Sequence, residues 1–109
     1  MHQNEIPPGT LYLLILKALA RGGELHGYEI ASWIEGVSDE VLQVEEGSLY
    51  PALQRMFIKG WVTAKWGVTA GNRRARYYRL TPLGRKQLEV EVSQFERVVQ
   101  AITRAIQTA

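Results

Sequence analysis

The sequence of 109 residues has no cysteine, only two histidines and no long hydrophobic run. Without cysteine there is no disulfide framework, no thiolate nucleophile and no cysteine-ligated zinc or iron–sulfur centre. His2 and His26 alone are too few ligands to indicate a metal site. The longest strongly apolar run, residues 11–16, is far shorter than the roughly 20 residues that span a bilayer, and the N-terminus lacks the basic region of a signal peptide. We therefore expect a soluble, cytoplasmic protein with no metal, no cofactor and no membrane partner.

Acidic residues are missing from one long segment. Residues 51–88 carry nine lysines and arginines and no aspartate or glutamate, whereas residues 1–50 carry eight acidic and two basic side chains. The net charge of +2 conceals this asymmetry. An acid-free segment of this length indicates a face that meets a polyanion, and nucleic acid is the first candidate. The alternative is that these charges are spread over a solvated surface.

Catalytic constellations are missing as well. The chain has no convincing Ser/His/acid set and no phosphate-binding glycine motif, and the acidic pair Glu45-Glu46 is adjacent in sequence rather than arranged about a cleft. The composition, 46% hydrophobic and 22% charged, is that of one globular domain with a single core. We expect a binding protein rather than an enzyme.

Hydrophobic periodicity predicts two helices in the first 40 residues. Residues 10–20 are apolar around most of a helix, with Thr10 as a candidate N-cap and Gly22 and Gly23 ending the element. A helix this apolar must lie in the core or be covered by a partner. Residues 26–35 form a second helix with apolar positions at i, i+3 and i+4.

A third helix is predicted to end at Lys59, after a short extended segment at residues 41–44. Pro51 decides where this helix begins. If Ser48 caps it, the proline falls in the first turn, where its missing N–H costs little, whereas a start near Glu46 would lead to a kink. We expect the later start. The predicted core stripe consists of Leu49, Leu53, Met56 and Phe57.

A β-hairpin with a basic tip is predicted to follow. Residues 61–66 and 74–80 alternate with the period of a strand, and residues 67–72 are rich in turn-forming glycine and asparagine. The alternation sends Tyr78 inward and leaves Tyr77 as the expected phosphate contact.

The last helix shows the clearest periodicity. It begins with Thr81 as N-cap and Pro82 at the first helical position. Its apolar residues are spaced 4, 3, 4, 3, 4 over about 40 Å of helix, which a domain of this size cannot cover by itself. We therefore predict dimerisation through this helix, the alternative being an amphipathic helix that lies on its own core. The seam consists of Leu88, Val92, Phe95, Val99, Ile102 and Ile106.

This order of elements predicts a mainly α fold with a small β-hairpin, in the α+β class. We expect residues 9–81 to form a winged helix-turn-helix DNA-binding domain and residues 82–107 to form a long C-terminal dimerisation helix. In such a fold the third helix enters the major groove, and the hairpin tip, the wing, reaches the neighbouring backbone or minor groove.

Four segments carry a family resemblance: LHGYEI at residues 25–30, EEGSLYPAL at 45–53, KGW at 59–61 and RYYRLT at 76–81. From about residue 9 to 106 the chain resembles the PadR family of bacterial transcriptional regulators, in its compact branch with one C-terminal helix. The resemblance implies a homodimeric regulator, usually a repressor. One departure is Phe57-Ile58, where the family usually has acidic residues. These two side chains have to pack on the wing or the last helix, or form an exposed patch.

The candidate DNA contacts share hydroxyl, amide or guanidinium groups on the third helix, the wing or the start of the second helix. Such groups bond to phosphates, to base edges in the major groove, or to a narrow minor groove. The alternatives are capping for Ser48, partial burial for Tyr50 and a solvated loop for the wing. In the family, the tyrosine that matches Tyr50 commonly faces DNA. The candidates are Tyr28, Ser48, Tyr50, Gln54, Asn72, Arg73, Arg74, Arg76 and Tyr77.

Phe95 is a candidate for a ligand pocket. The resemblance implies that members sensing planar aromatic compounds carry an aromatic ring at the matching position, at the dimer centre. A phenylalanine in a heptad seam is also ordinary core packing. We therefore expect a homodimer that binds an inverted-repeat operator in double-stranded DNA, with a small-molecule effector as a finer hypothesis. The rival interpretation is a winged-helix protein-interaction module with an acidic protein partner.

Overall fold

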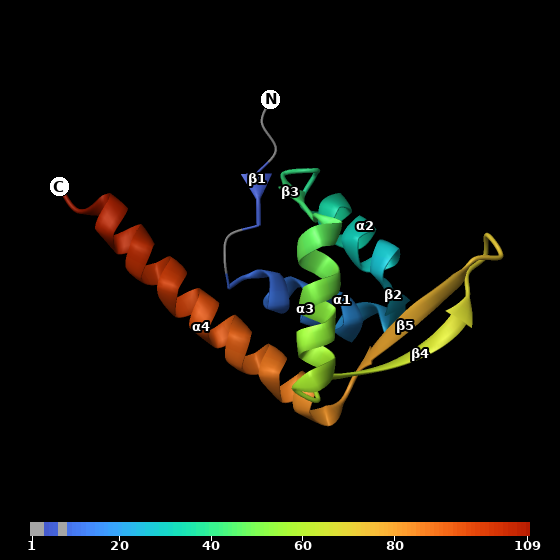
Figure 1. The fold of residues 1–109 in the computed structure, drawn as a ribbon. Coiled ribbons are helices and arrows are strands. Elements are labelled where there is room, and N and C mark those ends of the chain that lie inside the picture. Colours follow the sequence, from blue (N-terminus) through green and yellow to red (C-terminus); the bar gives the residue numbers. More distant parts are fainter. Residues whose placement is uncertain (1–3, 7–8) are drawn as a thin grey trace.

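The computed structural model describes residues 4–6 and 9–109. A cluster of three helices forms the body, a β-hairpin projects from one side, and the last helix projects from the other (Figure 1). In chain order the elements are β1 (Asn4–Glu5), α1 (Leu11–Gly22), β2 (Glu24–His26), α2 (Gly27–Val37), β3 (Leu42–Gln43), α3 (Glu46–Ile58), β4 (Val62–Val68), β5 (Arg74–Leu80) and α4 (Pro82–Gln107).

The main sheet has three antiparallel strands in the order β2-β5-β4. The predicted hairpin is present, with Val62 opposite Leu80 and Val68 opposite Arg74. Strand β2, which the sequence analysis did not predict, adds to the free edge of β5. A second, two-residue pairing joins β1 and β3 in parallel. The α+β winged-helix architecture is therefore the predicted one, with one more strand than expected in its main sheet.

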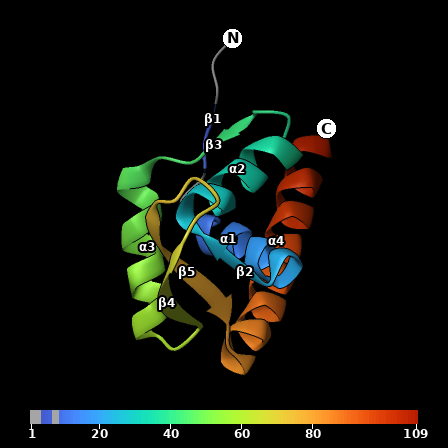
Figure 2. The ribbon, with the colours of Figure 1, turned by 90° about the vertical axis from the view of Figure 1, so that its right-hand side faces the viewer.

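The core is built around α1. This helix lies between α2, α3 and α4 (Figure 2), as expected from its nearly continuous apolar surface. Tyr78 is buried, which confirms the alternation inferred for β5. The buried side chains are Ile15, Leu16, Ala18, Leu19, Ile30, Ile34, Leu49, Ala52, Leu53, Met56, Val62, Tyr78 and Leu80.

Helix α3 begins earlier than predicted. The amides of Ser48 and Leu49 both donate to the Glu45 carbonyl, at 3.0 and 2.9 Å, so the expected start at Ser48 is wrong. Pro51 consequently lies in the second turn and cannot donate to the Gly47 carbonyl. Gly47 and Pro51 are both exposed, so water can satisfy that carbonyl, and the early start is tolerated.

Phe57 is not part of the core stripe that was predicted for α3. Leu49, Ala52, Leu53 and Met56 complete the buried stripe at the spacing i, i+3, i+4, i+7, whereas Phe57 is 40% exposed. Its position at the edge of the stripe places it beside the hairpin.

Helix α4 is tied most closely to the body at its first turn. Thr81 caps it as predicted, since its hydroxyl accepts from the Gly84 amide at 3.0 Å and donates to the Gly60 carbonyl at 2.6 Å. Gly84 lies against the Trp61 carbonyl so closely that any Cβ would collide with it. Gly84 is also the one fully buried residue of α4 among those the structure describes. Within residues 4–6 and 9–109, no helix is both long and apolar enough to cross a membrane.

Candidate nucleic-acid interface

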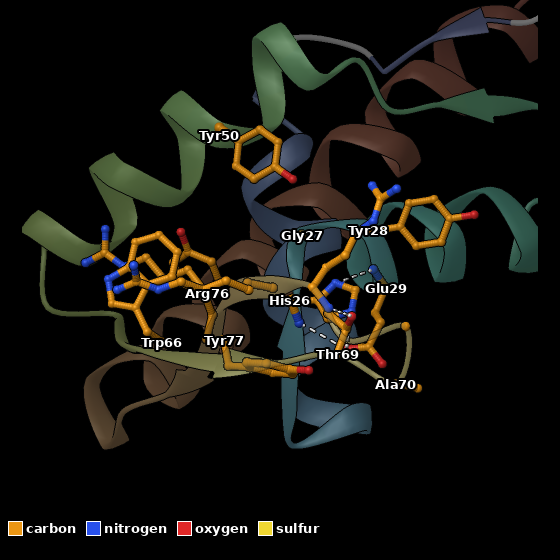
Figure 3. Close-up of a pocket in the computed structure, with 15 residues that line it drawn as sticks. His26, Gly27, Tyr28, Glu29, Tyr50, Trp66, Thr69, Ala70, Arg76 and Tyr77 are labelled. Carbon is orange, nitrogen blue, oxygen red and sulfur yellow. Dashed lines mark hydrogen bonds and ion pairs between the residues drawn. The ribbon is translucent and has the colours of Figure 1, made fainter.

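An open cavity with a volume of about 720 Å³ lies between the start of α2, the first half of α3 and the hairpin β4–β5 (Figure 3). We call it the wing concavity; residues 26–29, 50, 66, 69–71 and 73–78 line it. Six of the nine candidate DNA contacts line this surface, although they come from three separate parts of the chain. These six are Tyr28, Tyr50, Arg73, Arg74, Arg76 and Tyr77.

Tyr50 projects from α3 over the start of α2. Its side chain is about half exposed, and its hydroxyl points toward Gly27 (Figure 3). A Cβ on Gly27 would come within 2.8 Å of the Tyr50 ring and hydroxyl. The glycine therefore allows the ring to lie against α2 while its hydroxyl remains available to a ligand.

The first turn of α2 is closed by a capping box. The Glu29 amide donates to His26 Nδ1 at 3.4 Å, and the His26 amide donates to the Glu29 carboxylate at 3.1 Å. The capping box therefore occupies two amides at this helix end, those of His26 and Glu29, which a phosphate would otherwise bind. Tyr28 lies in this turn, and its side chain, 76% exposed, remains a candidate contact.

The wing arginines lie over aromatic rings. The Arg74 guanidinium is 4.4 Å from the centre of the Trp66 ring, and the Arg76 guanidinium is 5.2 Å from that of Phe57. Within the described part of the chain, Arg73, Arg74 and Arg76 form no ion pair.

On the other face of the sheet, away from Arg74 and Arg76, two basic side chains lie near a carboxylate. Glu24 lies 3.4 Å from Lys65 and 3.9 Å from Arg79, and both cations lie on the sheet face opposite Arg74 and Arg76, a face that Tyr77 shares. This carboxylate thus neutralises part of the outer face. Positive charge without a carboxylate partner is left on the concave face, where it attracts a polyanion.

Three candidate contacts lie outside the lining of the concavity. Ser48 and Gln54 are both exposed on α3. Asn72 is exposed at the hairpin tip with a φ of 63°, the left-handed conformation that asparagine tolerates. These three side chains are solvent-accessible but do not line the concavity.

Tyr77 is only partly exposed. As the alternation predicted, it lies on the face opposite Tyr78. Its ring covers Gly67 and meets His26 edge-on at 5.3 Å, and its hydroxyl donates to the Val68 carbonyl at 3.4 Å. The ring therefore has a structural role within the sheet, and its contact with DNA remains a prediction.

Tyr78 lies beneath the concavity. Burial raises the pKa of its hydroxyl, and the positive charge of Arg76 partly offsets that increase. The phenol is therefore neutral at physiological pH and adds no negative charge to a face that would meet phosphates.

Trp66 also lines this surface, although no pattern in the sequence predicted it. Strand alternation places Trp66 on one face of β4, but it does not show that Arg74, diagonally across on β5, lies over the Trp66 ring.

Of the Phe57-Ile58 pair, Phe57 packs beneath Arg76 of the wing, and Ile58 is 73% exposed. The departure at these positions therefore affects the wing rather than the core.

The apolar seam of α4 is largely uncovered. Leu88 packs against the core, whereas exposure rises from 36% at Val92 to 76% at Ile106. A second cavity of about 230 Å³ lies between the start of α1 and α4, and Phe95 lines it. Among the residues described, no group of three or more potential metal ligands lies together.

Comparison with known proteins gives consistent matches. The model of the family described as "Transcriptional regulator PadR-like family" matches residues 15–90. A transcriptional regulator from Clostridium thermocellum is 30% identical, over 88% of this chain and 92% of its own, with a TM-score of 0.80. "Uncharacterized protein X" of Lysinibacillus sphaericus is 29% identical over 102 residues, which are 94% of this chain and 93% of that protein.

One similar structure contains nucleic acid. Bacillus subtilis PadR in complex with operator DNA is 25% identical, with a TM-score of 0.67, over 76% of this chain and 46% of that protein. The similarity thus leaves more than half of the longer protein unmatched.

Proposed function

Because the chain belongs to the PadR-like family of transcriptional regulators, which are not enzymes, we propose that it is a homodimeric repressor that binds an inverted-repeat operator. The observation that carries this proposal is the wing concavity. It gathers three arginines without carboxylate partners beside the exposed Tyr50. A concave basic surface between a helix and a hairpin matches the two contacts that a winged helix makes with a duplex.

The proposed contacts fall into two groups. Arg73, Arg74 and Arg76 bind phosphates or the minor groove, because guanidinium groups on an exposed hairpin can follow the backbone. On α3, Ser48, Tyr50 and Gln54 face the major groove, where hydroxyl and amide groups read base edges. Tyr28 and Asn72 complete the proposed surface, together with Tyr77, which lines the concavity from the other face of β5.

We assign different functions to the winged-helix part of the chain and to α4. Residues 9–81 bind DNA, and α4 joins two protomers through its seam. The support for dimerisation is the exposure of Val92, Phe95, Val99 and Ile102 on a helix with a single buried residue, because such a seam is stable only when a partner covers it. Two-fold symmetry then predicts half-sites about 10 bp apart, centre to centre.

A finer part of the proposal is relief of repression by a small molecule at the dimer interface. Phe95 is half exposed and lines the cavity beside α1, so a planar aromatic compound has a ring to stack on. A thermal-shift screen of such compounds against the wild-type dimer and Phe95→Ala tests this. Compounds that stabilise both proteins equally would contradict a role for Phe95.

The first experiment selects bound duplexes from a randomised DNA pool at moderate salt, followed by sequencing. An enriched inverted repeat is expected. Retention without any motif would contradict sequence-specific binding. A monomer that retains no duplex would favour the rival interpretation, in which the basic face binds an acidic protein.

A matched pair of variants then tests the face that is used. Arg74 and Arg79 lie on the same strand, but they point to opposite faces, and only Arg79 lies near a carboxylate. Arg74→Ala is expected to weaken binding to cognate and random duplexes alike, whereas Arg79→Ala leaves it nearly unchanged. By contrast, Gln54→Ala is expected to change the preferred sequence. Equal losses for all three variants would contradict the assigned face.

A further inference from the structure

Two arginines and two aromatic rings form a continuous row from α3 along one face of the hairpin. Arg76 lies over the ring of Phe57, Arg74 lies over the ring of Trp66, and Trp66 is directly opposite Arg76 in the strand register. Residues opposite each other on neighbouring strands point to the same face. We call these four residues the arginine–aromatic row.

The row restricts arginines that would otherwise be mobile. An exposed arginine side chain samples many rotamers, and ordering it on binding costs free energy. A guanidinium group over an aromatic ring is attracted by the negative face of the ring. The rings offer no hydrogen-bond acceptors to compete for the guanidinium N–H groups, so all five donors of each arginine remain available.

The identity of the ring-bearing residues is informative. A carboxylate at position 57 or 66 would also hold an arginine, but it would cancel the charge and occupy the donors. Phe57 and Trp66 hold the arginines without doing either. They are 40% and 58% exposed, much more than residues that serve the core.

We propose that Phe57 and Trp66 are positioning residues that preorganise Arg76 and Arg74 for consecutive phosphates of one DNA strand. This inference rests on the proposed function as a DNA-binding regulator. Alternate residues of a strand lie about 6.7 Å apart, a separation comparable with that of neighbouring phosphates. The row therefore presents two restrained cations on one face of β5, from residues whose spacing along the strand is comparable with that of neighbouring phosphates.

The test is a binding series on the full chain. The probes are the duplex enriched from the randomised pool and a random-sequence duplex of equal length. Trp66→Leu is expected to weaken binding to both by about two- to tenfold for each protomer, the cost of ordering one released arginine. The dependence on salt concentration is expected to stay the same, because the number of cations is unchanged.

Three further variants separate positioning from a structural role. Trp66→Phe keeps a ring and is expected to restore most of the affinity. Val68→Ala is the control, since Val68 lies on the same face, opposite Arg74, but has no ring. In a double-mutant cycle, Trp66→Leu is expected to cause little further loss once Arg74 is alanine. The same logic applies to Phe57→Leu with Arg76→Ala, with the exposed Ile58→Ala as its control.

The outcomes are distinguishable. Wild-type affinity for Trp66→Leu and Phe57→Leu, or losses that add in full to those of the arginine variants, would overturn the inference while the proposed function stands. Failure of the wild-type chain to bind any duplex would overturn both.

Discussion

Single residues decide how the wing and α4 are placed, and Gly84 is the position that tolerates a side chain least. It occupies the first turn of α4, where the helix meets the turn that follows α3. Because the Trp61 carbonyl fills the space of a Cβ, every other residue type must push α4 away from the sheet. The backbone at this point sets the angle between the winged-helix part and the seam.

We predict that Gly84→Ala lowers the free energy of unfolding by about 1–3 kcal/mol, the typical cost of overpacking. Gly36→Ala is the control, because Gly36 lies near the end of α2 and, apart from its chain neighbours and the backbone of its own helix, a methyl group added there would meet no atom within 4 Å. That change is expected to stabilise the protein by about 0.4–1 kcal/mol. Urea unfolding of both variants measures the difference, and equal effects would contradict the close contact.

Tyr78 gives a prediction for alkaline pH. Burial raises the pKa of its hydroxyl in the folded protein, above the value of about 10 in the unfolded chain. The folded state then binds more protons than the unfolded state at high pH. The stability that this group contributes is therefore present below about pH 10 and is lost as the pH rises above it.

Tyr78→Phe removes this titration. Above about pH 10, the free energy of unfolding of the wild type is expected to fall more steeply with pH than that of the variant. Urea unfolding at several pH values from about 8 to about 11 checks this. Parallel curves would show that Tyr78 titrates alike in the two states.

At the scale of elements, α4 carries a prediction about assembly. Ile102 lies in the seam and is exposed in the single protomer, so its substitution leaves the core intact. We predict that Ile102→Asp gives a folded monomer, because two unpaired carboxylates would be buried at the interface. Gln100→Asp places the same charge on the same helix outside the seam and is expected to remain dimeric. Light scattering coupled to size exclusion distinguishes them, and a dimeric Ile102→Asp would contradict the seam.

The sequence predicts those elements whose evidence is local. The hairpin and α4 were predicted within about two residues because strand alternation and the heptad spacing are properties of the segment itself. Strand β2 was missed because three residues after a glycine pair show no period, and its partner β5 is distant in the chain. The start of α3 was placed too late, because the cost assigned to Pro51 ignored solvent at the Gly47 carbonyl.

The candidate site shows the same division. Charge counting identified the wing arginines, and hairpin geometry identified their strand. The contacts of Arg74 with Trp66 and of Arg76 with Phe57 depend on the register of two strands and on the packing of α3 against them. No one-dimensional pattern contains that register, so Phe57 was placed in the core and Trp66 was overlooked.

At the scale of the whole molecule, the hairpin and the free end of α4 project from opposite sides of the helical body (Figure 1). This arrangement allows two protomers to join through α4 without covering either wing concavity. The proposed dimer therefore presents two basic faces to one duplex. The salt dependence of its binding constant is therefore expected to reflect the phosphate contacts of both protomers.

We predict that the salt dependence of binding reports how many phosphate contacts the two basic faces make. If three wing arginines of each protomer contact phosphates, the logarithm of the binding constant falls with the logarithm of salt concentration with a slope of about −5. Replacing Arg73 and Arg74 by alanine removes four contacts from the dimer and is expected to reduce the slope by about 3.6. Arg79→Ala, on the outer face, is expected to leave it unchanged.

The monomeric variant connects the salt dependence with assembly. Ile102→Asp on a duplex with one half-site is expected to show about half of the wild-type slope, because a single wing then contacts phosphates. Fluorescence anisotropy between about 50 and 200 mM salt measures all four proteins. A monomer with the full slope would mean that one protomer already makes every phosphate contact, and the role of α4 would then be separate from DNA binding.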